Sequence, residues 1–193
     1  ALAAALRGLG YRAESLPMPT RDTVRIGRRH TSGKECVPMT ITLGSVLERL
    51  ESERDTDERF ALLIPRADGP CRFGAYNMLY KITLERLGWK DRVSVWSPSS
   101  RHYFEGAPSG LAALAFSGFM AEDLLLEARY DVRPVEKRSG AADEIYARYT
   151  TELRGLLERA GSGDLSTSGV LLEVARGRLF GCTSVLERAA REF

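Results

Sequence analysis

The sequence predicts an α/β fold in which a parallel sheet with flanking helices is followed by a C-terminal helical portion. Two short apolar runs, at residues 60–64 and 93–97, enclose a helical pattern, which gives a strand–helix–strand order. Pro65 and Pro98 end these runs, and a continuous apolar run of this length is typical of a buried strand in a parallel sheet. Beyond Ser99 the chain carries only helical patterns. These observations together define the predicted class.

The residues before the first of these strands are predicted to form short helices and strands. Residues 1–9 have the pattern of a helix closed by glycine, and residues 11–16 and 24–27 are predicted strands. A longer helix is predicted to begin at Pro38, because proline is favoured at the first helical position and apolar residues follow at helical spacing. Residues 51–59 are rich in charge, and we expect a solvated connection there.

The last part of the chain is predicted to consist of helices over residues 110–129, 141–160 and 169–193, which glycine and proline separate. We therefore predict an α/β domain over residues 1–109 and a helical portion over residues 110–193 packed on it. The sequence opens with helical character and without methionine, which we interpret as a fragment of a longer polypeptide.

The composition of the chain limits which kinds of partner and which cellular compartment we expect. The net charge is +2, from 28 basic and 26 acidic residues, so neither nucleic acid nor an anionic membrane is the expected partner. Three cysteines make an odd set, which argues against a secreted disulfide framework. There is no signal-peptide pattern and no apolar run near the roughly 20 residues that span a bilayer. We therefore predict a cytoplasmic protein.

Two of the cysteines lie in glycine- and proline-rich turns just ahead of helical patterns. Cys36 lies in GKECVP at residues 33–38, and Cys71 lies in GPCRFG at residues 69–74. The N-terminus of a helix favours a thiolate over a thiol, because its free N–H groups and macrodipole stabilise negative charge. Thiolates on closely approachable backbone are the ligands of iron–sulfur clusters. Two alternatives stay open, namely inert packing thiols and a thiol–disulfide pair.

These motifs, together with GRRH at residues 27–30 and SPSS at residues 97–100, resemble the 2-hydroxyacyl-CoA dehydratases and their activases. The resemblance covers most of residues 1–135 and fades in the C-terminal helices. It implies an oxygen-sensitive [4Fe–4S] cluster on a Rossmann-like domain, which aerobic preparation of a fragment can remove. In that family an activator uses ATP to drive one electron into the cluster, and the reduced cluster promotes radical loss of water from an acyl-CoA.

Carried over to this sequence, the resemblance implies a set of ligands and a set of charge-neutralising groups. Cys36 and Cys71 would be metal ligands, and Cys182 is a possible third ligand. A structural role for Cys182, or a third ligand from elsewhere in the polypeptide, fits equally well. The groups expected to neutralise cluster or substrate charge are the Lys34 and Arg72 side chains and the backbone N–H groups of Gly69 and Gly74.

The predicted function is therefore that of a cluster-binding domain in low-potential electron transfer or radical dehydration of an acyl-CoA. Its expected partners are the remaining domains of the same polypeptide, including an ATPase activator region, and an acyl-CoA. The segment from Gly27 to Lys34 does not match a phosphate loop, since five residues rather than four separate Gly27 from Gly33. The alternative is a non-catalytic docking or scaffold domain with structural cysteines, so whether the chain is an enzyme stays open.

Overall fold

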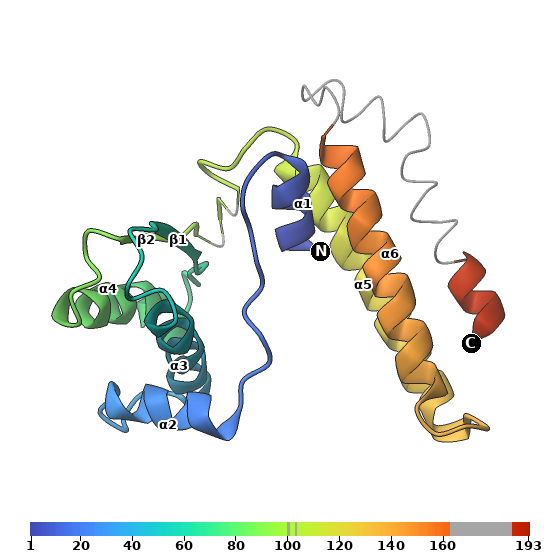
Figure 1. Ribbon diagram of the computed structural model, residues 1–193, viewed down its shortest axis with the longest axis horizontal. Helices are drawn as coiled ribbons and strands as arrows, with labels where there is room; N and C mark the ends of the chain where they lie inside the picture. Colours follow the sequence, from blue (N-terminus) through green and yellow to red (C-terminus); the bar gives the residue numbers. More distant parts are fainter. Residues whose placement is uncertain (100, 103, 163–186) are drawn as a thin grey trace. The chain divides into compact units, whose positions relative to one another are not determined.

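The computed structural model describes residues 1–99, 101–102, 104–162 and 187–193, which belong to two compact units (Figure 1). The cysteine-bearing unit is Leu16–Gly106. The helical unit combines Ala1–Ser15 with the described residues after Gly106. None of the helices in these described ranges combines the length and apolar character needed to cross a bilayer.

The cysteine-bearing unit has mixed α/β structure. Its elements are α2 (Arg21–Arg29), α3 (Val37–Glu51), β1 (Phe60–Leu63), the 3₁₀ helix η1 (Arg72–Ala75), α4 (Tyr76–Arg86) and β2 (Val93–Trp96). β1 and β2 pair in parallel, with Phe60 opposite Val93 and Leu63 opposite Trp96. The predicted parallel strand–helix–strand unit is thereby confirmed. Within the described residues the sheet has these two strands.

The two strands predicted ahead of the cysteine motif are wrong. Residues 11–16 form no regular element, and residues 24–27 lie within α2. A capping box begins this helix: the Thr20 hydroxyl accepts the Thr23 N–H at 3.3 Å, and the Thr23 hydroxyl accepts the Thr20 N–H at 3.0 Å. This local hydrogen bonding, together with packing against α3, favours helix over the extended pattern.

α2 and α3 cross at a very short distance, which two glycines permit. A Cβ atom on Gly27 would lie 1.9 Å from the carbonyl oxygen of Thr40, and one on Gly44 would lie 2.0 Å from that of Thr23. The buried Thr23 hydroxyl also donates to Glu48 Oε2 at 2.7 Å. Because residue 27 lies against 40 and residue 23 against 44, the two helices run antiparallel as a hairpin. Its connecting loop leads directly into Cys36.

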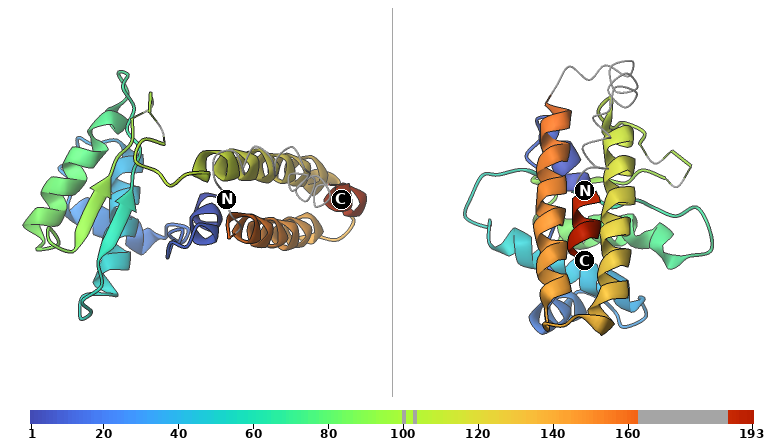
Figure 2. Two further views of the ribbon diagram at one scale, coloured as in Figure 1. Left: turned by 90° about the horizontal axis from the view of Figure 1, so that it is seen from above. Right: turned by 90° about the vertical axis from the view of Figure 1, so that its right-hand side faces the viewer.

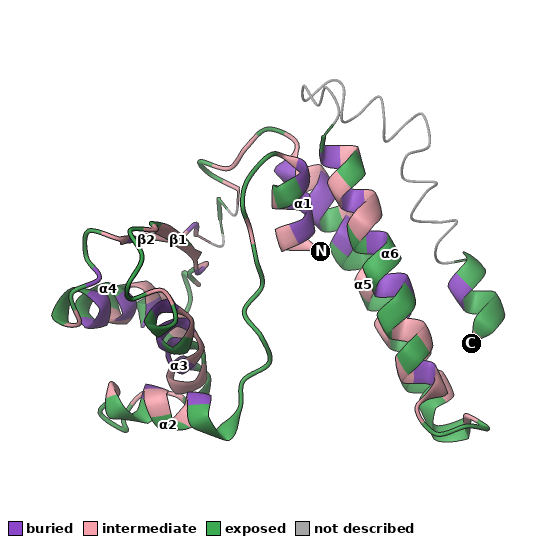
Figure 3. Cartoon of the chain, in the orientation of Figure 1, coloured by how far each residue is buried: buried purple, intermediate pink, exposed green. Residues whose placement is uncertain are grey.

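Side chains from α3, α4 and both strands share one core. Figure 3 colours the chain by burial, with buried residues in purple. Most members of this core are buried almost completely, among them Met39, Leu43, Leu47, Leu50, Tyr80, Leu84, Trp89 and Val93. Burying an aliphatic or aromatic side chain contributes about 1.5–3 kcal/mol. The packing of α3 and α4 therefore fixes the positions at which these helices begin, and the two cysteines lie next to those positions.

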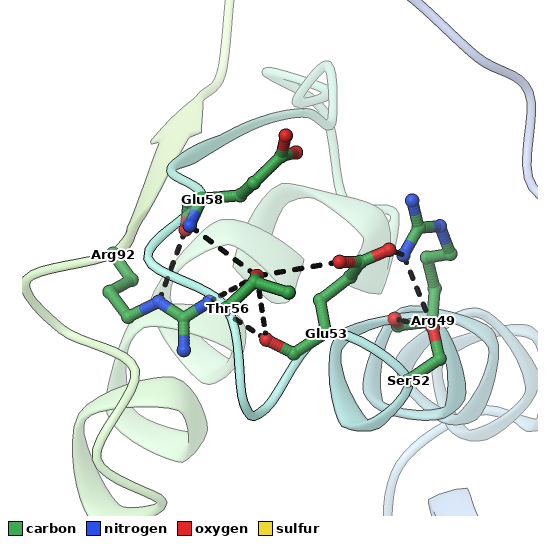
Figure 4. Close-up of polar contacts among 6 residues, drawn as sticks. All are labelled: Arg49, Ser52, Glu53, Thr56, Glu58 and Arg92. Atoms are coloured by element: carbon green, nitrogen blue, oxygen red, sulfur yellow. Dashed lines mark hydrogen bonds and ion pairs between the residues drawn. The ribbon is translucent and has the colours of Figure 1, made fainter.

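The Arg92 side chain anchors the connection between α3 and β1 through hydrogen bonds (Figure 4). The Arg92 guanidinium donates to the backbone oxygens of Glu53 at 2.9 Å and Glu58 at 3.1 Å. A further bond reaches the backbone oxygen of Arg54 at 3.1 Å. The guanidinium also donates to the Thr56 hydroxyl at 3.3 Å. The charge run predicted as solvated is thus anchored through its backbone to the residue just ahead of β2.

The helical unit contains α1 (Leu2–Gly8), α5 (Leu111–Val132), the 3₁₀ helix η2 (Arg133–Val135) and α6 (Ala141–Gly161). These confirm the helices predicted over residues 1–9, 110–129 and 141–160. The helix predicted over residues 169–193 lies largely outside the described residues, and residues 187–192 are helical.

α1 packs against α5 and α6 and so belongs to the helical unit (Figure 2). The sequence had placed it with the cysteine motifs in a domain over residues 1–109. The reason lies in two glycines: a Cβ on Gly8 would lie 2.6 Å from the carbonyl oxygen of Glu158, and one on Gly161 would lie 2.7 Å from the carbonyl carbon of Gly8. This close approach lets Ala4 join Leu125, Leu153 and their neighbours in a second core.

Candidate functional site

Each cysteine of the two motifs lies at the N-terminus of a helix. Cys36 is the N-cap residue of α3, and Pro38 occupies the second helical position rather than the first. Cys71 is the N-cap residue of η1, which continues into α4. Cys36 is half-buried and Cys71 is exposed, and both are free thiols. The prediction that each cysteine precedes a helix is therefore confirmed.

Two contacts join the first cysteine motif to the second. The Cys36 sulfur and the Tyr76 hydroxyl share a hydrogen bond with Sγ and Oη 2.8 Å apart. Arg72 Nη1 donates to the backbone oxygen of Lys34 at 2.8 Å. Residues that lie about 40 positions apart in the sequence thus form one local structure, to which both motifs contribute.

The surroundings of Cys36 favour its thiolate. The Tyr76 hydroxyl lowers the pKa of the Cys36 thiol most, and hydrogen bonding by the Met39 backbone N–H and the positive charge of Arg72 lower it further. The Met39 contribution is the one expected at a helix N-terminus. Burial raises the pKa of Tyr76, and its contact with Cys36 raises it further. The thiol therefore gives up its proton more readily than an ordinary cysteine does, and the phenol less readily than an ordinary tyrosine.

Cys71 and Arg72 are neighbours in the second motif, and both side chains are exposed. Soft thiolates next to a guanidinium are suited to hold a metal centre of net negative charge. The two cysteines are free thiols, and a metal site built on them stays a prediction.

The loop ahead of Cys36 is shaped by Glu35. Its carboxylate accepts the Ser32 backbone N–H at 2.9 Å and the Ser32 hydroxyl at 3.1 Å. These bonds, the backbone N–H of Ser32 foremost, lower the pKa of Glu35. The carboxylate is thus engaged in closing a turn at Gly33, whose φ of +83° suits glycine.

The predicted charge-neutralising residues have distinct environments. The Lys34 side chain is exposed, and its backbone oxygen is occupied by Arg72. The Gly74 N–H donates to the Cys71 backbone oxygen at 3.1 Å, so it is already used inside the turn. A Cβ on Gly74 would lie 2.6 Å from the Ala67 carbonyl oxygen, which explains the glycine there. Gly69 has open space around it.

No protein-family model matches this sequence, and no curated protein or solved structure is significantly similar to it. The resemblance to the dehydratases therefore rests on the sequence motifs described above, and the activity that it implies stays a prediction.

The ligand set for a metal is not complete within the described residues. No group of three or more His, Cys, Asp or Glu side chains suited to a metal ion occurs in that part of the chain. Cys182, the predicted third ligand, lies outside the described residues. A cluster bound by Cys36 and Cys71 would take its further ligands from that region or from another polypeptide segment.

The sequence analysis did not single out Tyr76. Its ring is buried, since the residue is 5% exposed. Its hydroxyl, however, reaches Cys36 from the opposite motif. No spacing in the sequence signals a contact across 40 residues between side chains of two separate helices.

Proposed function

We propose that the cysteine-bearing unit binds an iron–sulfur cluster through the thiolates of Cys36 and Cys71. The observation that carries this proposal is the 2.8 Å contact between the Cys36 sulfur and Tyr76, which links the first cysteine to the helix that follows the second cysteine motif. The Arg72 contact to Lys34 supports the same link. In this role the unit serves a dehydratase- or activase-like protein in low-potential electron transfer or radical dehydration of an acyl-CoA.

The residues of the site have separate tasks in this proposal. Cys36 and Cys71 hold the metal, and the Arg72 guanidinium offsets the negative charge of the bound group. The cluster, when bound, supplies a one-electron centre of low potential. The cytoplasm, which keeps thiols reduced, is the compartment that suits such a site. The activator region and the acyl-CoA remain the proposed partners.

We further propose that β1 and β2 are part of a larger Rossmann-like sheet. Within the described residues, each strand is paired along one edge only. Parallel strands are normally buried on both faces within larger sheets. The position of Cys71 after the C-terminal end of β1 supports this proposal, since open α/β sheets bind ligands at that end.

Anaerobic reconstitution with ferrous iron and sulfide tests the proposed cluster. We expect the parent chain to take up iron and sulfide, with visible charge-transfer absorption and an EPR signal after reduction. A Cys36→Ala, Cys71→Ala double variant should lose this uptake. Val37→Ala is the matched control, because Val37 is adjacent to Cys36 and 68% exposed, and it should load as the parent does.

Circular dichroism of each variant establishes that it is folded before loading. Equal uptake by the double variant overturns the proposal, and so does a folded parent chain that takes up no cluster. A Cys182→Ala variant tests the third ligand separately, because loss of iron there with a folded chain assigns that position to the site.

A docking module is the second candidate, and one surface favours it. Met78 and Ile82 lie one turn apart on α4 and are 62% and 57% exposed. Large apolar side chains exposed together are typical of surfaces that bind another protein. A folded parent chain that takes up no iron under the conditions above would favour this candidate over the cluster.

A further inference from the structure

We propose that the chain self-associates through two different faces, with the exposed face of α4 in one copy docking against the exposed face of α5 in a second copy. The α4 face carries apolar and basic side chains, and the α5 face carries apolar and acidic ones. This inference goes beyond the proposed cluster and does not depend on it, since none of the residues involved lies in the two cysteine motifs.

The exposed face of α5 is apolar over two turns. Phe116, Met120 and Leu124 follow one another at four-residue spacing and are 57%, 68% and 52% exposed. This spacing places their side chains on one face of the helix, whereas the buried residues Gly118 and Leu125 lie on the opposite face. Large apolar side chains exposed together are typical of a surface that binds another protein.

Acidic side chains accompany this apolar face. Asp123, Glu127 and Asp131 are exposed and also follow at four-residue spacing, with Asp123 three residues after Met120 and Glu127 three residues after Leu124. Within the described residues none of the three carboxylates forms an ion pair. A complementary partner must therefore present basic groups together with apolar ones.

The exposed face of α4 has this composition. Met78 and Ile82 lie one turn apart and are 62% and 57% exposed. Lys81 and Arg86 are exposed on the same helix, three residues after Met78 and four residues after Ile82. In the part of the chain that the structure describes, neither of these cations takes part in an ion pair.

The two faces are complementary in shape of pattern and in charge. On each helix, two apolar side chains one turn apart are followed at three or four residues by charges, which are basic on α4 and acidic on α5. The carboxylate of Glu85, which also lies on α4, forms an ion pair with Lys90. Two α5 faces would instead bring like charges together, which is unfavourable. The contact therefore joins different surfaces of two copies rather than the same surface twice.

Sedimentation equilibrium of the 193-residue chain over a wide range of protein concentration tests this contact. A reductant is present, so that disulfides of the exposed Cys71 do not contribute. We expect the apparent mass to rise with protein concentration. The dissociation constant should rise severalfold at about 1 M sodium chloride, where the Debye length falls to about 3 Å.

Reversing the charge of one face at a time identifies the surfaces. A Lys81→Glu, Arg86→Glu chain and an Asp123→Lys, Glu127→Lys chain should each self-associate at least about tenfold more weakly than the parent, because like charges then meet. An equal mixture of the two variants should associate again. In that mixture the acidic α4 face of one variant meets the basic α5 face of the other.

Two control variants change the net charge by the same amounts at exposed positions outside both faces. These are Arg28→Glu, Arg29→Glu and Asp55→Lys, Asp57→Lys, and both should self-associate as the parent does. Circular dichroism establishes that every variant is folded before its mass is measured.

Three results would overturn the inference. The first is a chain that stays monomeric at every concentration. The second is self-association that persists at the parent's strength in either charge-reversed chain, since another surface would then make the contact. The third is a mixture of the two charge-reversed chains that fails to associate. None of these results bears on the proposed function, which the uptake of iron and sulfide tests separately.

Discussion

Replacing Gly27 by alanine tests the helix crossing that leads into the candidate site. Alanine is the better helix former by about 1 kcal/mol, so Gly→Ala in a free helix is stabilising. Here the added methyl group would lie 1.9 Å from the carbonyl oxygen of Thr40. That atom belongs to the backbone of α3 and has no rotamer by which it could move away. We therefore expect Gly27→Ala to lower the free energy of unfolding rather than raise it.

The magnitude follows from the distance. An ordinary contact of a Cβ atom begins at 3.4 Å, so α2 and α3 must separate by up to about 1.5 Å to admit the methyl group. Overpacking of this kind costs typically 1–3 kcal/mol, and a clash with backbone lies at the upper end. After the gain in helix propensity, the net loss is about 2 kcal/mol. For a small domain this lowers the urea midpoint by roughly 1–2 M.

The chain has two tryptophans, Trp89 and Trp96, and both lie in the cysteine-bearing unit. Tryptophan fluorescence during urea unfolding therefore reports on this unit alone, whereas circular dichroism at 222 nm reports on both. We expect Gly27→Ala to lower the fluorescence midpoint. Gly44→Ala should do the same, because its methyl group would lie 2.0 Å from the Thr23 carbonyl oxygen.

Gly155→Ala is the matched control. It lies inside α6, and a Cβ atom there meets only the flexible end of Arg159 at 3.4 Å. We expect it to stabilise the helical unit by about 1 kcal/mol, seen by circular dichroism, with the fluorescence midpoint unchanged. If Gly27→Ala were as stable as the parent, or more stable, the close crossing of α2 and α3 would be refuted.

Two further predictions concern the polar anchors of each unit. Arg92→Lys should destabilise the cysteine-bearing unit by about 1–2 kcal/mol, measured by circular dichroism in urea, since an ammonium cannot replace the planar set of donors that binds residues 53–58. Glu136 accepts the backbone N–H groups of Gly140 at 2.6 Å and Ala142 at 2.9 Å at the start of α6, and these bonds lower its pKa. Its stabilisation is therefore complete above the ordinary carboxyl pKa, about 4.3, and is lost as the pH falls through the lower folded value. The stability difference between the parent and Glu136→Gln should accordingly be clear at pH 7 and shrink towards pH 3.

Both predictions have direct controls. Arg59→Lys changes an exposed arginine just ahead of β1 and should alter the free energy of unfolding by less than about 0.5 kcal/mol. An effect of Arg92→Lys no larger than this would remove the anchoring role of Arg92. A difference between the parent and Glu136→Gln that stays constant from pH 7 to pH 3 would show that the Glu136 charge is not what caps α6.

The elements predicted correctly from sequence are those whose pattern is local. A short window of sequence is enough to recognise the apolar runs at β1 and β2 and the helical spacing of α4, α5 and α6. α2 was missed because Val24 and Ile26 alternate as in a strand, while the residues that decide the outcome are Thr20, Thr23 and Gly27. The capping box was readable in the sequence. The contact of Gly27 with Thr40 was not, since it depends on a partner helix.

The same difference between local patterns and long-range contacts applies to the candidate site. The positions of Cys36 and Cys71 before helices were predicted because turn residues and helical patterns are local signals. The Arg72 contact to Lys34 and the Tyr76 contact to Cys36 were not, since each spans about 40 residues. The grouping of α1 with α5 and α6 likewise depends on a long-range packing of Gly8 against α6. Sequence spacing carries no information on these distances.

Tyr76 illustrates why such a site is hard to recognise from apolar patterning. Its ring belongs to the core of the cysteine-bearing unit and its hydroxyl belongs to the thiolate site, so one side chain satisfies two requirements. A substitution that removes the ring would disturb both the core and the thiolate site, so the two effects could not be distinguished. Tyr76→Phe keeps the ring against Phe73 and removes only the oxygen that meets the sulfur. Any change in the reactivity of the Cys36 thiol in that variant must therefore arise from the hydrogen bond, because the packing that positions α4 is preserved.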